Sequence, residues 1–99
     1  MNYKLLVRPE AELDIEEAYE WYEEGNPGLG YEFIRAVDTC LASVGRNPLP
    51  YPVVNQEVRR ALIRRFPYGV FYFLEEDKIV VIACFHVKRD PQQWQNQID

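Results

Sequence analysis

The sequence has 99 residues, 47% of them hydrophobic and 14% aromatic, and a net charge of −5. This length allows one domain with a single core, and the apolar content excludes an intrinsically disordered chain. The negative charge argues against general nucleic-acid binding, and no apolar run approaches the roughly 20 residues of a membrane span.

The first half of the chain predicts a strand and then two helices. Residues 3–8 alternate with one apolar face, as in a strand, and Pro9 suits the first turn of a helix. Apolar residues then recur at helical spacing in two segments separated by residues 25–28. In the first segment they are Ala11, Ile15, Ala18, Tyr19 and Tyr22, with Glu12, Glu16, Glu20 and Glu23 on the opposite face. In the second they are Phe33, Val37, Cys40, Leu41 and Val44. Gly45 is expected to end this helix, so the two form an antiparallel hairpin.

The second half predicts a meander of three strands. Three prolines make residues 47–52 an extended connector. Residues 60–66 form a plausible strand, and residues 70–74 and 79–85 are rich in Val, Ile, Phe and Tyr, which favour strands. The polar residues 75–78 are short enough for a hairpin. Between the first two strands, Pro67-Tyr68-Gly69 is expected to form the turn, because Pro67 cannot donate to a ladder and Gly69 tolerates positive φ.

This order of elements, β-α-α-β-β-β, predicts an α+β fold and a single domain over residues 1–99. The helical hairpin should cover one face of a small, mostly antiparallel sheet and leave the other face or its rim for function. After the last strand, Asp90 is a suitable N-cap, Pro91 follows at N1 and Gln93 completes a capping box. A short C-terminal helix anchored by Trp94 is therefore expected.

The two cysteines, Cys40 and Cys84, each lie within an apolar pattern. Isolated cysteines of this kind are expected to be buried, reduced thiols and neither a disulfide nor a metal pair. Neither a metal nor a cofactor site is predicted. The N-terminal residues do not resemble a signal peptide, so we expect a cytoplasmic protein.

The charges are unevenly distributed along the chain. Eight of the sixteen acidic residues lie between Glu10 and Glu24. Most of the basic residues lie at the ends of the meander, at Arg59, Arg60, Arg64, Arg65, Lys88 and Arg89, near the only histidine, His86. One interpretation is purely structural, with a solvated acidic helix and a sheet edge protected by arginines. The other is that this basic end of the meander carries the function.

Two segments resemble the RelE/ParE superfamily of bacterial toxins, which are the toxin halves of type II toxin–antitoxin modules. They are residues 65–72, Arg-Phe-Pro-Tyr-Gly-Val-Phe-Tyr, and residues 82–94, Ile-Ala-Cys-Phe-His-Val-Lys-Arg-Asp-Pro-Gln-Gln-Trp. The start of the first helix, from Val7-Arg8-Pro9-Glu10-Ala11 to Asp14-Ile15, is similar as well. The resemblance covers nearly the whole chain and implies a cognate antitoxin as partner, with a homodimer or a heterotetramer with the antitoxin as assemblies.

The resemblance implies two different activities. ParE-like members are non-enzymatic inhibitors of DNA gyrase, and RelE-like members are endonucleases that cut mRNA on the ribosome. If the chain were a ribonuclease, His86 would be the catalytic residue, because its reference pKa suits proton transfer near neutral pH. The dense Lys/Arg set of the RelE-like branch is absent, and the acidic first helix would repel RNA. We therefore favour the gyrase inhibitor, with mRNA cleavage and a non-toxic partner-binding module as alternatives.

For the favoured activity we expect one set of target-binding residues near the basic end of the meander. Its members are Arg64, Arg65, Tyr68, Lys88, Arg89 and Trp94. Tyr68 and Tyr72 are also candidates for simple packing aromatics.

Overall fold

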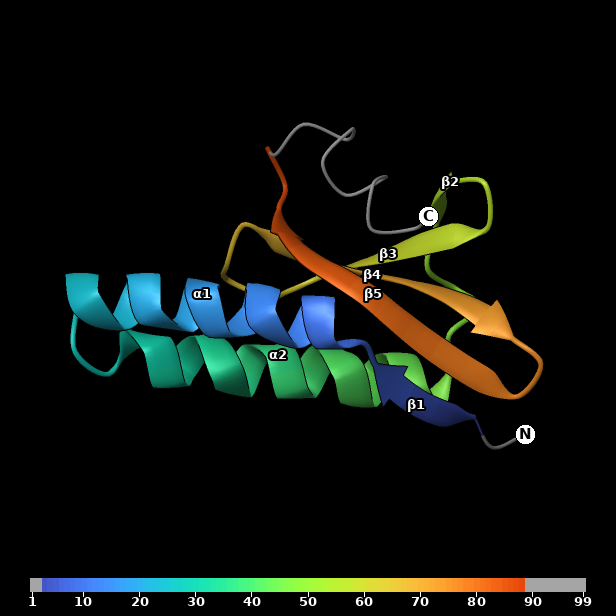
Figure 1. Ribbon diagram of the computed structural model, residues 1–99, viewed down its shortest axis with the longest axis horizontal. Coiled ribbons are helices and arrows are strands. Elements are labelled where there is room, and N and C mark those ends of the chain that lie inside the picture. The colour runs from blue at the N-terminus through green and yellow to red at the C-terminus, as the bar shows by residue number, and fades with distance from the viewer. Residues whose placement is uncertain (1–2, 89–99) are drawn as a thin grey trace.

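The computed structural model describes residues 3–88 and has one helical layer against one sheet (Figure 1). The elements are β1 (Lys4–Val7), α1 (Pro9–Gly25), α2 (Leu29–Arg46), β2 (Val53–Asn55), β3 (Val58–Leu62), β4 (Tyr68–Glu75) and β5 (Lys78–His86). The α+β class and the β-α-α-β-β-β layout are confirmed, with β2 as one additional short strand. The predicted C-terminal helix, with Asp90, Gln93 and Trp94, lies outside the described residues.

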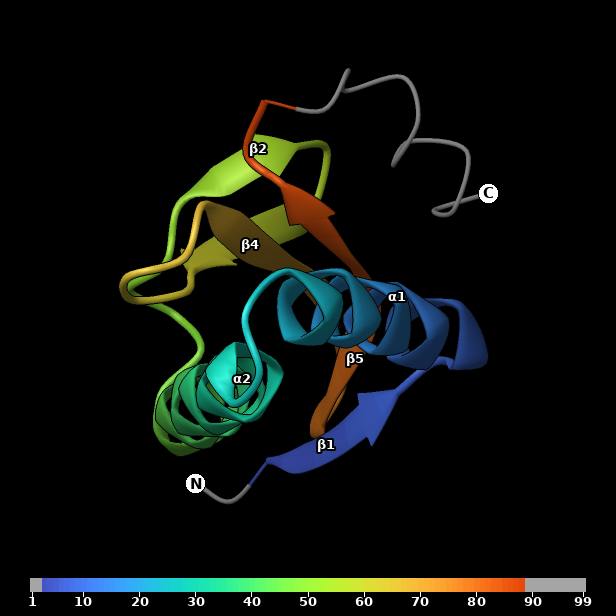
Figure 2. The same cartoon turned by 90° about the vertical axis from the view of Figure 1, so that its left-hand side faces the viewer.

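The sheet has the order β1-β5-β4-β3-β2. β1 pairs with β5 in parallel, from Lys4↔Lys78 to Val7↔Val81, and the other neighbours are antiparallel. Figure 2 shows the helical hairpin on one side of this sheet, with β1 alongside β5. β5, the last of the described strands in sequence, therefore lies between β1 and β4.

The predicted helical faces agree with the packing. Ala11 and Ala18 of α1 are buried, as are Phe33, Val37 and Val44 of α2. They join side chains from the helical side of the sheet in one core. Leu41 is only half-buried at the margin of this core. The second helix does not end at Gly45 but continues to Arg46 and is capped by Asn47.

The far face of the sheet also carries an apolar cluster. Its buried members are Val58, Phe71, Val80, Ile82, Ala83 and Phe85. Phe71 and Phe85 are only 4% and 3% exposed. The centre of this face is therefore buried, and of the two surfaces expected to be free for function, the face or its rim, the rim stays the prediction.

The turn between β3 and β4 differs from the prediction. β3 ends at Leu62, so Arg64 and Arg65 lie in the turn and not on a strand, whereas Tyr68 and Gly69 already belong to β4. The left-handed residue is Arg65, with φ of 68°. Gly69 pairs with Leu62 in the ladder. A Cβ on Gly69 would lie 3.1 Å from Cγ of Arg60, so this glycine serves close side-chain packing and not a positive φ.

Glu23 has a structural role that its position opposite the apolar stripe does not reveal. Its carboxylate accepts hydrogen bonds from the backbone N–H groups of Gly28, at 2.9 and 3.1 Å, and Gly30, at 3.0 Å. These donors begin α2 and have no partner within that helix. Gly28 itself has φ of 95°. Glu23 thus caps the second helix from the end of the first.

We expect Glu23→Ala to lower the free energy of unfolding by about 1 kcal/mol, the usual cost of a lost N-terminal cap. Glu16→Ala is the matched control, because Glu16 is exposed on the same helix and should cost less than about 0.5 kcal/mol. Urea unfolding of both variants measures the difference. Equal losses would show that the Glu23 hydrogen bonds contribute no more than an exposed carboxylate.

A candidate partner-binding groove

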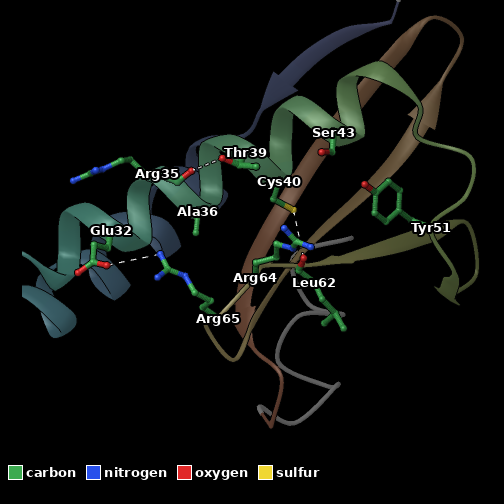
Figure 3. Close-up of a pocket in the computed structure, with 10 residues that line it drawn as sticks. All are labelled: Glu32, Arg35, Ala36, Thr39, Cys40, Ser43, Tyr51, Leu62, Arg64 and Arg65. Carbon is green, nitrogen blue, oxygen red and sulfur yellow. Dashed lines mark hydrogen bonds and ion pairs between the residues drawn. The ribbon is translucent and has the colours of Figure 1, made fainter.

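A groove of about 420 Å³ runs between one face of α2 and the outer edge of β3 (Figure 3). α2 contributes Glu32, Arg35, Ala36, Thr39, Cys40 and Ser43, which recur at helical spacing. The opposite wall consists of Tyr51 from the connector, Leu62 from β3, and Arg64 and Arg65 from the following turn. Two of the predicted target-binding residues are therefore brought together here.

The groove is predominantly cationic. Arg35, Arg64 and Arg65 line it with a single acidic residue, Glu32. Arg65 and Glu32 approach to 3.8 Å, but their side chains are 71% and 47% exposed, so this ion pair contributes little to stability. Within residues 3–88 it is the only salt bridge, so neither Arg35 nor Arg64 is paired with a carboxylate of this part of the chain.

The far end of the groove is fixed by hydrogen bonds to the connector. The Arg59 guanidinium donates to the carbonyl oxygens of Leu49, at 2.9 Å, and Tyr51, at 2.7 Å. The buried Tyr72 hydroxyl donates to the carbonyl oxygen of Pro48 at 2.6 Å, and burial raises its pKa. Arg59 of β3 and Tyr72 of β4 therefore fix the position of the connector beside the sheet.

Cys40 lies at the floor of the groove as a buried, free thiol. Desolvation raises the pKa of this thiol to about 11, so it stays protonated at neutral pH and is a poor nucleophile. Its sulfur approaches the carbonyl oxygens of Ala61 and Leu62, each at 3.9 Å. Cys84 is also free and buried, and neither cysteine offers covalent chemistry.

His86, the candidate catalytic residue, does not line the groove. It ends β5 opposite Tyr68, and the two rings lie 5.4 Å apart. The backbone N–H of Lys88 donates to Nδ1 of His86 at 3.1 Å. Because Nδ1 accepts this bond, the neutral ring carries its proton on Nε2.

Tyr68 occupies an aromatic cluster on the helical side of the sheet. Its ring lies 5.2 Å from Phe33 and 6.0 Å from Tyr22, in edge-on contacts, and it is half-buried. This packing places Tyr68 apart from the groove that holds Arg64 and Arg65. Lys88 is exposed just beyond β5, and Arg89 and Trp94 lie outside the described residues.

Of the residues that line the groove, only Arg64 and Arg65 were predicted as site residues; the others, among them Arg35, Tyr51 and Leu62, were not. The available signal for Arg35 was its position as the only basic residue in α2 before the C-terminal turn. No local pattern marked Tyr51 or Leu62, because both reach the groove through the path of the connector and the end of β3.

A family model described as the ParE toxin of the type II toxin–antitoxin system parDE matches residues 5–91. The chain belongs to the ParE toxin family. No curated protein sequence matched the chain. The type II toxin assignment agrees with the resemblance noted in residues 65–72 and 82–94, and the match includes every predicted target-binding residue except Trp94.

Two solved toxin–antitoxin structures share the ParE fold of this chain. A chain of the chromosomal ParDE system from P. aeruginosa aligns with a TM-score of 0.77 and 14% identity, covering 85% of this chain and 95% of that one. A chain of the RelBE2 complex from Mycobacterium tuberculosis aligns with a TM-score of 0.60 and 16% identity, covering 87% and 99%. At these identities the likeness shows a common fold.

Two further observations concern this ParE-family chain alone. Neither helix within residues 3–88 has the length and apolarity needed to cross a bilayer. The same residues contain no group of three or more His, Cys, Asp or Glu side chains that could bind a metal ion.

Proposed function

We propose that this ParE-family toxin inhibits DNA gyrase and is neutralised by a cognate antitoxin. The observation that carries the proposal is the position of His86 outside the groove that holds Arg64 and Arg65. RNA cleavage requires a base that takes the proton of the attacking 2′-hydroxyl and cations that neutralise the phosphate. Nδ1 of His86 is occupied by the Lys88 N–H, and Arg64 and Arg65 line a groove to which His86 does not contribute.

The charge distribution supports a protein target over an RNA target. Eight acidic residues lie between Glu10 and Glu24, and α1 carries no basic residue in its last turn. This helix belongs to the hairpin that forms one side of the molecule (Figure 1) and would repel a polyanion such as RNA. A compact cationic groove on a chain whose first helix is acidic suits selective recognition of an acidic protein surface.

Two assays on the toxin separated from its antitoxin test this proposal. The first measures supercoiling of relaxed plasmid by gyrase, and the second measures cleavage of mRNA in a reconstituted translation reaction. We expect supercoiling to fall, with cleaved DNA accumulating, while the mRNA stays intact. Ribosome-dependent mRNA cleavage with unaffected gyrase would favour the RelE-like alternative. No effect in either assay, together with normal growth on expression, would favour a non-toxic binding module.

A further inference from the structure

The outward face of α1 combines acidic residues with two exposed apolar ones. Its members recur at i, i+4, i+7, i+8 and i+11, opposite the buried stripe, and are Leu13, Glu17, Glu20, Trp21 and Glu24. Leu13 is 54% exposed and Trp21 is 69% exposed, and the three glutamates are exposed as well. A helical face that carries apolar anchors is the kind that binds in the groove of a partner.

The glutamates of this face are not neutralised by the described part of the chain. α1 contains no basic residue, and the single salt bridge of residues 3–88 joins Arg65 to Glu32. Glu17, Glu20 and Glu24 therefore form no salt bridge within these residues. Glutamates three and four positions apart on a helix repel one another, so a cationic surface placed against them would be stabilising.

The groove between α2 and β3 has the complementary chemistry. Three arginines, Arg35, Arg64 and Arg65, line it together with a single acidic residue. Its apolar surface comes from Ala36 of α2 and from Leu62 of the opposite wall, which is 58% exposed (Figure 3). The groove therefore offers cations for the glutamates of a helix and apolar surface for its anchors.

The acidic face and the groove lie on different sides of one molecule. α1 packs on α2 and on β5, whereas the groove lies on the flank of α2 that faces the β3–β4 turn. In Figure 2 this turn is at the left and α1 is at the right. A copy therefore cannot place its own α1 in its own groove, but a second copy brings an α1 of matching charge. A contact between two different surfaces of identical chains is head to tail.

We propose that α1 of one copy docks into the α2–β3 groove of a second copy, with its glutamates against the arginines. The net charge of −5 opposes association, but this repulsion is screened beyond about 8 Å at physiological ionic strength, whereas charges in contact are screened less. Docking covers Arg64, so a docked copy could not use this residue on gyrase. That consequence rests on the proposed function, whereas the docking itself rests on the two surfaces.

Sedimentation equilibrium of the full-length free toxin is the first test. We expect the average mass to rise between about 1 and 100 µM at about 0.15 M salt, for a dissociation constant on the order of 10 µM. At about 0.5 M salt the assemblies should dissociate, because the charge pairs are screened. A monomer over the whole range would overturn the proposal, and so would an association that persists unchanged at the higher salt.

The second test mixes two variants that each lose one surface. The groove variant carries Arg35→Glu and Arg64→Glu, and the helix variant carries Glu17→Gln and Glu20→Gln. Each alone should associate at least about 10-fold more weakly than the wild type. Mixed, they should form one-to-one pairs with nearly wild-type affinity, because the unchanged α1 of the groove variant fits the unchanged groove of the helix variant. Circular dichroism melts establish that both variants are folded.

Net charge alone predicts the opposite result for the helix variant. Its two substitutions remove two negative charges and change the net charge from −5 to −3, which lowers the general repulsion between copies and would strengthen association. The matched control is Glu57→Gln with Glu75→Gln, which makes the same change at exposed residues outside α1 and the groove. This control should associate at least as tightly as the wild type.

The outcomes separate this inference from the proposed function. If the helix variant associates as tightly as the control, α1 is not the docking helix. If the mixture of the two variants stays monomeric, the two surfaces do not bind each other, and the proposal is wrong. Gyrase inhibition by a toxin that is monomeric at every concentration would refute only the docking. Association as expected, without any effect on gyrase, would refute only the proposed function.

Discussion

Replacing Phe33 with alanine should lower the free energy of unfolding by about 3–5 kcal/mol, the range for a fully buried phenylalanine. Phe33 is 0% exposed and is surrounded by the rings of Tyr22, Phe66 and Tyr68 at 5.2 to 5.3 Å. These rings come from α1, the β3–β4 turn and β4. The substitution therefore opens a cavity where the helical hairpin meets the sheet.

The matched control is Leu13→Ala on α1. Leu13 is 54% exposed, so its truncation should cost less than about 1 kcal/mol. Leu41→Ala should fall between the two, because Leu41 is half-buried at the margin of the core. Urea unfolding midpoints of the three variants rank them. Comparable losses for Phe33→Ala and Leu13→Ala would contradict this description of the aromatic cluster.

The second prediction concerns His86 and Arg64 in the isolated toxin. If the toxin inhibits gyrase, no proton transfer is required of it, and His86→Ala should change the inhibitory concentration only a few-fold through lost packing on Tyr68. Arg64→Glu reverses a charge on the proposed recognition surface and should weaken inhibition roughly 10-fold or more. Arg64→Lys is the control, since it keeps the charge. The supercoiling assay measures all three.

The opposite pattern would identify a ribonuclease. Loss of a general base lowers a cleavage rate by roughly 10²–10⁴-fold. Ribosome-dependent mRNA cleavage by the wild type that disappears in His86→Ala would therefore refute the gyrase proposal.

The helical half of the fold could be predicted from the sequence, because apolar residues at helical spacing mark the buried face of each helix. Ala11 and Ala18 of α1 and Phe33, Val37 and Val44 of α2 follow the spacing of one helical face, and all are buried. The hairpin at residues 75–78 was readable for a similar reason. Its polar residues interrupt two apolar runs, and Glu75 pairs with Lys78.

The groove was less predictable, because it depends on contacts between distant residues. The arginine pair at positions 64 and 65 was identified, but on a strand and not in a turn. Nothing in the local sequence indicates that Arg65 adopts positive φ while Gly69 does not. Arg59 and Tyr72 fix the connector by donating hydrogen bonds to the carbonyl oxygens of Pro48, Leu49 and Tyr51. Every residue has a backbone carbonyl, so the sequence does not indicate which carbonyls accept these bonds.

The parallel pairing of β1 with β5 has a consequence for how the protein is made. Lys4 of β1 pairs with Lys78 of β5, so the sheet is completed by a contact between residues that are far apart in the sequence. Contacts of long sequence separation slow folding, because the intervening chain loses entropy before the contact forms. Both β1 and β4 need β5 as a neighbour, and β5 is made after all the other described elements. A nascent chain that stops short of β5 cannot assemble this sheet, so the described fold arises only after residue 86 has been made.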